Sequence, residues 1–156
     1  MNGLVKRLKA RGARVKVDTA GRVVGVRYTD RVIEKTDLDL LVECRVLQRL
    51  DLEGSRLDDS GLARLATITS LESLSLHDAK VTDGGLKVLG RLVRLKSLGL
   101  AGTGIGDGGL EHLSALGAVL RGLRHWGDLS HNESASAGRA VRLHRQSRYH
   151  HCLHLK

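Results

Sequence analysis

The sequence predicts an α/β solenoid, in which short strands form a parallel sheet and short helices cover one side of it. Two observations lead to this prediction. A pattern of apolar residues recurs at a constant interval through the middle of the chain, as Leu47, Leu71 and Leu95 show, and each unit changes from strand-like to helix-like periodicity halfway along. One such unit is too small to bury its own leucines, so neighbouring units must stack around a common core.

The first half of each unit is the run Leu-x-x-Leu-x-Leu. It occupies residues 47–52, 71–76 and 95–100, and residues 23–28 have the same pattern with Val and Tyr in place of Leu. The end of the run alternates, so that Leu50 faces the core and Asp51 faces away, as in a half-buried strand. Four such strands at a spacing of about 4.8 Å predict a small sheet, with an arc of about 15–20 Å.

The second half of each unit places apolar residues three apart, which predicts a short helix with one buried stripe. Its apolar columns are Ile33, Leu57, Val81 and Ile105; Leu38, Leu62, Leu86 and Leu110; Leu41, Leu65, Leu89 and Leu113; and Cys44, Ile68, Leu92 and Leu116. The position of Cys44 predicts a small buried core residue. Asp59, Asp83 and Asp107 precede these helices, and we expect their carboxylates to accept N–H groups of the first turn.

These runs resemble the leucine-rich-repeat family. The Leu-x-x-Leu-x-Leu runs match its strand motif, and residues 81–86 (Val-Thr-Asp-Gly-Gly-Leu) and 105–110 are similar to its ribonuclease-inhibitor-like, F-box-associated and bacterial "T-D-x-G-L" repeats. The resemblance covers residues 20–118. It implies a right-handed solenoid with a parallel sheet on the concave side, helices on the convex side, and protein recognition through the concave sheet.

The sequence departs from this family pattern at one column. The family's usual Asn or Cys after the strand is replaced by Arg31, Ser55, Ala79 and Thr103. The hydroxyl groups of Ser55 and Thr103 can still bond to nearby backbone, whereas a continuous ladder of Asn side chains is missing.

Three regions are expected along the chain. Residues 1–20 predict an N-terminal cap of one helix and one strand. Residues 21–118 predict four repeats of 24 residues, which is the step from Leu47 to Leu71. Residues 119–156 form an irregular basic tail that holds six of the eight histidines. A genuine basic tail, ordered or disordered, and a segment altered by loss of the coding frame both explain this composition.

The net charge of +9 lies at the two ends of the chain. Residues 51–118 hold 7 Lys and Arg against 9 Asp and Glu, compared with 12 against 6 in residues 1–50 and 7 against 2 in residues 119–156. A nucleic-acid surface needs basic residues along one face of the folded part, so the sequence disfavours such a partner. It also lacks an apolar run long enough for a signal peptide or a membrane span, and we expect a cytoplasmic protein without a membrane partner.

Three motifs resemble reactive sites and have a simpler structural explanation. Residues 104–109 match the dinucleotide motif G-x-G-x-x-G, but the same slot in other repeats is an ordinary connector. Residues 150–154 (His-His-Cys-Leu-His) lack a second cluster of metal ligands. Ser75, His77 and Asp78 imply no nucleophile turn or oxyanion hole. We therefore expect no enzymatic activity, no cofactor, no metal ion and no small-molecule substrate.

The remaining functional prediction is a protein–protein interaction module that uses the concave sheet face. The strand positions expected to be exposed there are Val24, Gly25, Arg27, Gln48, Arg49, Asp51, Glu72, Ser73, Ser75, Lys96, Ser97 and Gly99. Arginines often dominate binding energy, so Arg27 and Arg49 are the main expected contacts. The other expected binding residues are Asp51, Glu53, Ser73, Ser75 and His77.

Other interpretations stay open. In the first interpretation, the concave face binds no partner and is only solvated. In the second, the chain is a truncated or frame-damaged fragment of a longer repeat protein without independent activity. An F-box-type substrate adaptor would need an N-terminal helical module, which the short segment 1–20 does not supply.

Overall fold

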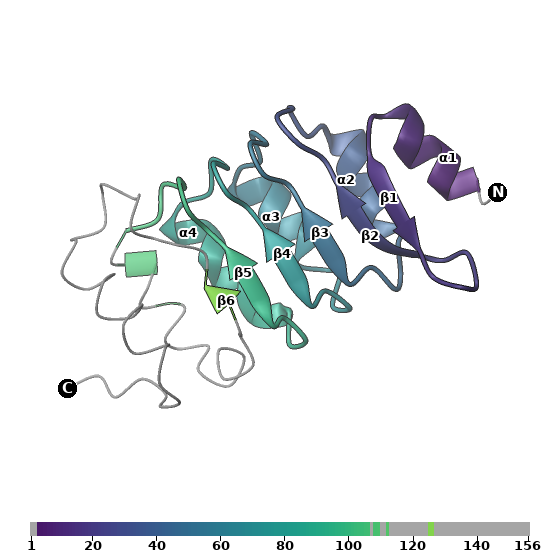
Figure 1. Ribbon diagram of the computed structural model, residues 1–156. Coiled ribbons are helices and arrows are strands. Elements are labelled where there is room, and N and C mark those ends of the chain that lie inside the picture. The colour runs from purple at the N-terminus through teal and green to yellow at the C-terminus, as the bar shows by residue number, and fades with distance from the viewer. Residues whose placement is uncertain (1–2, 107, 110–111, 113–124, 127–156) are drawn as a thin grey trace.

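In the computed structural model, short helices cover one side of a six-stranded sheet (Figure 1). The structure describes residues 3–106, 108–109, 112 and 125–126. The elements are α1 (Gly3–Ala10), β1 (Arg14–Val17), β2 (Val23–Arg27), α2 (Lys35–Val42), β3 (Arg49–Asp51), α3 (Asp59–Leu65), β4 (Ser73–Ser75), α4 (Asp83–Leu86), the 3₁₀ helix η1 (Lys87–Arg91), β5 (Ser97–Gly99) and β6 (His125–Trp126). The strands lie in the sheet in chain order, so each unit packs on the next. The predicted α/β solenoid is confirmed.

The repeat interval of the sequence is the register of the parallel part of the sheet. Gly25 of β2 lies beside Arg49 of β3, Arg49 lies beside Ser73 of β4, and Ser73 lies beside Ser97 of β5. The pairing continues from Ser97 to His125 of β6, which is a longer step along the chain than the one from Ser73 to Ser97. The strict period therefore ends after β5.

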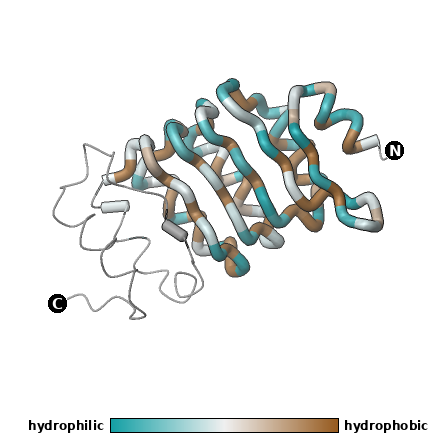
Figure 2. The backbone as a smooth tube through the Cα atoms, viewed as in Figure 1, coloured by the Kyte–Doolittle hydropathy of each residue, from teal (hydrophilic) through white to brown (hydrophobic). Residues whose placement is uncertain are grey.

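The leucine columns form the core between the sheet and the helices. Figure 2 shows apolar residues alternating with hydrophilic ones along the strands, and the apolar residues Leu50, Leu74 and Leu98 are buried in adjacent strands. Cys44 is also buried and its thiol donates to the carbonyl oxygen of Leu40 (3.3 Å), as expected of a core residue. Burial raises the pKa of the Cys44 thiol to about 11. The expected core positions at 110, 113 and 116 lie outside the described residues.

The helix starts differ from the sequence prediction. Asp58, not Asp59, is the N-cap of α3, and its carboxylate accepts the backbone N–H of Gly61 (2.9 Å). The carboxylates of Asp59 and Asp83 instead accept hydrogen bonds from the next repeat, at Thr82 and Gly106. The prediction that these two aspartates cap their own helices was wrong, because Asp58 and Thr82 occupy the N-cap positions and the aspartates bond to N–H groups of the adjacent repeat. Asp107 lies outside the described residues.

The position after each strand, where the family usually has Asn or Cys, confirms the prediction for one hydroxyl group and contradicts it for the other. Ser55 and Thr103 are both buried. The hydroxyl of Thr103 donates to the carbonyl oxygen of Leu100 (2.6 Å), whereas the hydroxyl of Ser55 has no hydrogen-bond partner among the described residues. Bonding of the side chain to nearby backbone is therefore correct for Thr103 and wrong for Ser55.

A second column, one residue before Ser55 and Thr103, requires left-handed backbone. Asp30, Gly54, Asp78 and Gly102 have φ angles of 51°, 67°, 57° and 71°. Asp and Gly alternate here for a spatial reason. A Cβ atom on Gly54 would lie 2.3 Å from Oδ1 of Asp30, so the carboxylate of one repeat occupies the space that a side chain of the next would need.

The N-terminal helix α1 and strand β1 are attached to the first repeat by the sheet and by a buried carboxylate. β1 pairs antiparallel with β2, unlike the parallel strands that follow. Asp37 of α2 is fully buried and accepts hydrogen bonds from the guanidinium groups of Arg11 and Arg31. Asp37 also accepts the backbone N–H of Glu34 (2.9 Å), which completes the first turn of α2. One buried charge therefore links the end of α1 to the start of α2.

Candidate functional site

The face of the sheet turned away from the helices, here called the open face, carries its outward side chains in rows. Because the strands pair in register, residues at matching positions lie side by side. One row runs through Lys16, Gly25, Arg49, Ser73 and Ser97, and the next runs through Arg14, Arg27, Asp51, Ser75 and Gly99. Cationic side chains thus gather at the β1–β3 end of both rows.

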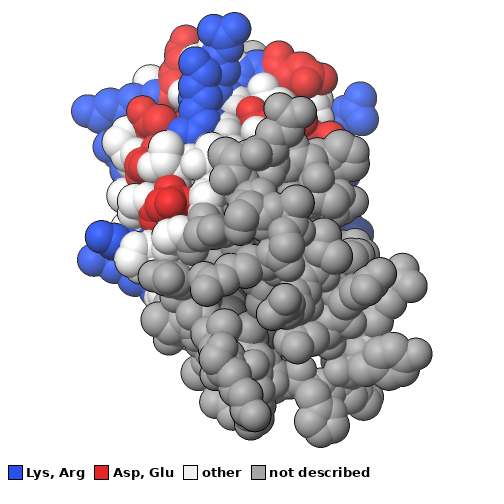
Figure 3. All heavy atoms as spheres, turned by 90° about the vertical axis from the view of Figure 1, so that its left-hand side faces the viewer, with Lys and Arg blue, Asp and Glu red and all other residues white. Residues whose placement is uncertain are grey.

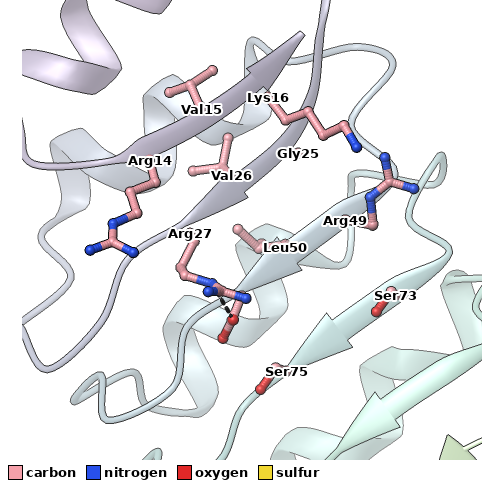
Figure 4. A pocket seen from close by; sticks show the side chains of 11 residues that line it. Arg14, Val15, Lys16, Gly25, Val26, Arg27, Arg49, Leu50, Ser73 and Ser75 are labelled. Carbon is pink, nitrogen blue, oxygen red and sulfur yellow. Dashed lines mark ion pairs between the residues drawn. The ribbon is translucent and has the colours of Figure 1, made fainter. Parts of the chain in front are cut away.

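These rows enclose an open hollow of about 400 Å³ on strands β1 to β4 (Figure 4). It is lined by Arg14, Val15, Lys16, Gly25, Val26, Arg27, Arg49, Leu50, Asp51, Ser73 and Ser75. Five of the seven residues predicted to bind a partner, namely Arg27, Arg49, Asp51, Ser73 and Ser75, line this one hollow.

Arg27 and Asp51 form an ion pair across neighbouring strands. The Nε atom of Arg27 lies 2.7 Å from Oδ2 of Asp51, while Oδ1 of Asp51 accepts the backbone N–H of Glu53 (3.2 Å). Both oxygens of the Asp51 carboxylate are therefore engaged. The pair holds the Arg27 side chain in place over the sheet, although about half of it is exposed to solvent.

The other cations of the hollow are less compensated. All three, Arg14, Lys16 and Arg49, are exposed to solvent. Within the part of the chain that the structure describes, no ion pair involves any of the three. Glu72 directly precedes Ser73, and its Oε2 atom lies 2.8 Å from Nζ of Lys96. This bond from Lys96 lowers the pKa of Glu72, so the carboxylate is ionised and already paired.

On the side of the molecule seen in Figure 3, the described residues carry charge of both signs. Viewed from the C-terminal side, Lys and Arg side chains alternate with Asp and Glu side chains (Figure 3). The hollow differs, because four cations, Arg14, Lys16, Arg27 and Arg49, meet one carboxylate. Its lining is therefore positively charged.

Glu53 and His77 do not line the hollow. Glu53 is exposed beyond the end of β3. His77 is half-buried and its Nδ1 atom accepts the backbone N–H of Ala101 (3.1 Å). Its ring lies over Gly99, where an added Cβ atom would approach Nε2 of His77 to 2.4 Å. His77 thus bonds to the next repeat, a contact that the spacing in the sequence does not reveal.

Three positions expected to be exposed on this face are buried, namely Val24, Gly25 and Gly99. Lys16 and Arg49 flank Gly25, and His77 covers Gly99. Conversely, Arg14 and Lys16 line the hollow but are not among the binding residues predicted from the sequence. The alternation Arg14-Val15-Lys16-Val17 placed both cations on one side of a strand, but only the antiparallel pairing with β2 brings that side to the open face.

Comparison with known proteins identifies the repeats. A family model described as Leucine Rich repeat matches residues 43–66 and 67–90, two adjacent units of the sequence period. Residues 43–90 are therefore leucine-rich repeats. No curated protein matches it. Leucine-rich repeats are commonly protein-interaction modules and typically serve as non-enzymatic scaffolds. Among the described residues, no helix of this chain is long and apolar enough to span a lipid bilayer.

Proposed function

We propose that this chain is a protein-recognition module that binds its partner on the open face. In this proposal residues 21–118 supply the repeats and α1 with β1 caps their N-terminal end. The module works without a cofactor, and Arg27 and Arg49 are the main contacts, with Asp51, Ser73 and Ser75 beside them.

The observation that supports this function best is the hollow on β1–β4. The helices cover the other side of the sheet, so the outward side chains of the strands are available to a partner (Figure 1). The hollow has small side chains, Ser73 and Ser75, next to long ones, Arg27 and Arg49. A concave surface with apolar residues such as Val26 and Leu50 in its lining and arginines at its border suits a protein partner, because arginine combines charge, directed hydrogen bonds and apolar stem contacts.

Site-specific crosslinking tests this assignment. A benzophenone amino acid is placed at Ser73 on the open face or, as a control, at Ala63, which is exposed on helix α3. After irradiation in the source cells, we expect a discrete protein adduct from position 73 and none from position 63. Substitution of Ser75 by Tyr fills the hollow and is expected to abolish the adduct. The same adduct from both positions, or none from position 73, would refute the proposed function.

A further inference from the structure

We propose that the hollow binds an acidic, extended segment of the partner protein, with alternate carboxylates held by Lys16, Arg14 and Arg49. This inference rests on the proposed function and specifies the chemistry of the partner. It also moves the centre of the site toward β1, whose cations were not part of the sequence prediction.

The first support is uncompensated positive charge. Lys16 and Arg49 lie on either side of Gly25, and their side chains point toward each other (Figure 4). The one carboxylate that lines the hollow, that of Asp51, is held by Arg27 and by a backbone N–H group. Glu72 also attracts Arg49 electrostatically, but its carboxylate is bonded to Lys96. Two cations brought together without a shared anion repel each other, and an incoming carboxylate would bind both and relieve that repulsion.

The second support is the shape of the hollow at Gly25. A Cβ atom at this position would lie 3.2 Å from Cβ of Lys16 and 3.9 Å from Cβ of Arg49. Gly25 is itself buried, and its lack of a side chain lets the stems of Lys16 and Arg49 pack on either side of it. Ser73 continues the same row beyond Arg49 and offers a hydroxyl donor. An anionic group can therefore approach from solvent and meet charge on both sides.

The third support is spacing. Arg14 and Lys16 are two residues apart on one side of β1, which places them about 6.6–6.8 Å apart along the strand. An extended peptide of the pattern Glu-x-Glu presents its carboxylates at the same repeat. Alternate acidic residues of one strand-like segment thus match alternate cations of β1.

The lining favours a peptide over a nucleic acid. None of the eleven residues that line the hollow is aromatic, so the hollow offers no ring on which bases could stack. The four cations also occupy two short rows instead of a long track that follows a phosphate backbone.

Fluorescence anisotropy with the full chain tests the proposal. The probe is a labelled ten-residue peptide in which Glu alternates with Ser, with three competitors: a Lys-Ser peptide, a short oligothymidine of the same charge, and phosphatidylserine vesicles. The variant Lys16→Glu/Arg49→Glu removes the central cations. The matched control Lys87→Glu/Arg91→Glu makes the same charge change at two exposed positions of η1, in the helix layer.

We expect the Glu-Ser peptide to bind the wild type and the η1 variant alike, and the Lys16/Arg49 variant about tenfold or more weakly. Raising the salt concentration from about 50 to about 300 mM should weaken wild-type binding, because it shortens the screening length. Equal losses in both variants, or tighter binding of oligothymidine or vesicles than of the peptide, would overturn the proposal. Circular dichroism checks that each variant is folded.

The two hypotheses can fail separately. If the adduct at Ser73 persists in the Lys16/Arg49 variant, the open face binds a protein and the acidic-segment proposal is wrong. If position 73 gives no adduct although the acidic peptide binds, the proposed function itself is wrong.

Discussion

The carboxylate of Asp59 accepts both hydrogen-bonding protons of Thr82, which belongs to the next repeat. The backbone N–H of Thr82 lies 2.8 Å from Oδ1 of Asp59, and the Thr82 hydroxyl lies 2.6 Å from Oδ2. The contact recurs one repeat later, where Asp83 accepts the backbone N–H of Gly106 (2.7 Å). The Asp of each connector is thus a bond between repeats, and it explains the Thr-Asp pair at 82–83.

This contact predicts measurable coupling between Asp59 and Thr82. We expect Asp59→Ala to lower the free energy of unfolding by about 1–2 kcal/mol and Thr82→Val by about 1 kcal/mol, since Val lacks the hydroxyl donor. In the double mutant the two losses should fall short of additivity by about 0.5–1 kcal/mol, measured by urea unfolding. Thr69→Val is the control, because Thr69 is exposed and its hydroxyl has no partner among the described residues. Strict additivity would show that the bond contributes nothing.

Two adjacent glycines in α4 should respond in opposite ways to alanine. A Cβ atom on Gly85 would lie 2.4 Å from Oδ1 of Asp59, whereas one on Gly84 would have no neighbour closer than 3.5 Å. Gly85→Ala should destabilise the protein by about 1–3 kcal/mol through overpacking. Gly84→Ala should be neutral or stabilising by up to about 1 kcal/mol, because Ala favours the helix. Thermal unfolding compares the two, and equal melting temperatures would contradict the packing model.

The column of left-handed residues gives a similar pair. Gly54 and Gly21 have φ angles of +67° and +73°, so Ala at either position costs about 1 kcal/mol in backbone strain. Only Gly54 faces a neighbour, Oδ1 of Asp30 at 2.3 Å from an added Cβ atom. Gly54→Ala should therefore be more destabilising than Gly21→Ala in urea unfolding. Adding Asp30→Gly should recover the difference, and absence of that rescue would rule out the contact as its cause.

Asp37 should make stability depend on acidic pH. Burial acts to raise its pKa, but hydrogen bonds from Arg11 and from the backbone of Glu34, together with the charge of Arg31, lower it below the ordinary value of 3.8. A carboxyl group whose pKa is lower in the folded state stabilises the protein above the unfolded pKa. That stabilisation is lost as the pH falls through the folded pKa.

Asp37→Asn should accordingly lower the free energy of unfolding by about 2 kcal/mol at pH 7, because it removes the charge that faces two guanidinium groups. The difference in the free energy of unfolding between variant and wild type should narrow below about pH 4, because Asp37 of the wild type becomes protonated there. Asp39→Asn is the control, since Asp39 lies in the same helix and is about half exposed in its pair with Arg64. A gap that stays constant from pH 7 to 3 would show that the charge of Asp37 is not stabilising.

The sequence by itself determined the repeat architecture. Leu50, Leu74 and Leu98 are buried because apolar side chains at a constant spacing must leave water together. The same spacing set the pairing of Arg49 with Ser73 and of Ser73 with Ser97. These features follow from local periodicity, which is visible in a single chain.

Tertiary structure alone decided which polar groups meet. The sequence shows a carboxylate at Asp59 near a helix start, but its partner Thr82 is set by the distance between two stacked repeats. Likewise, only the antiparallel pairing of β1 with β2 brings Lys16 next to Gly25 and Arg49. A hydrogen bond or a charged pair acts over a few ångströms, so it depends on how units far apart in the chain are stacked, whereas the burial of a leucine depends only on which side of its strand it occupies.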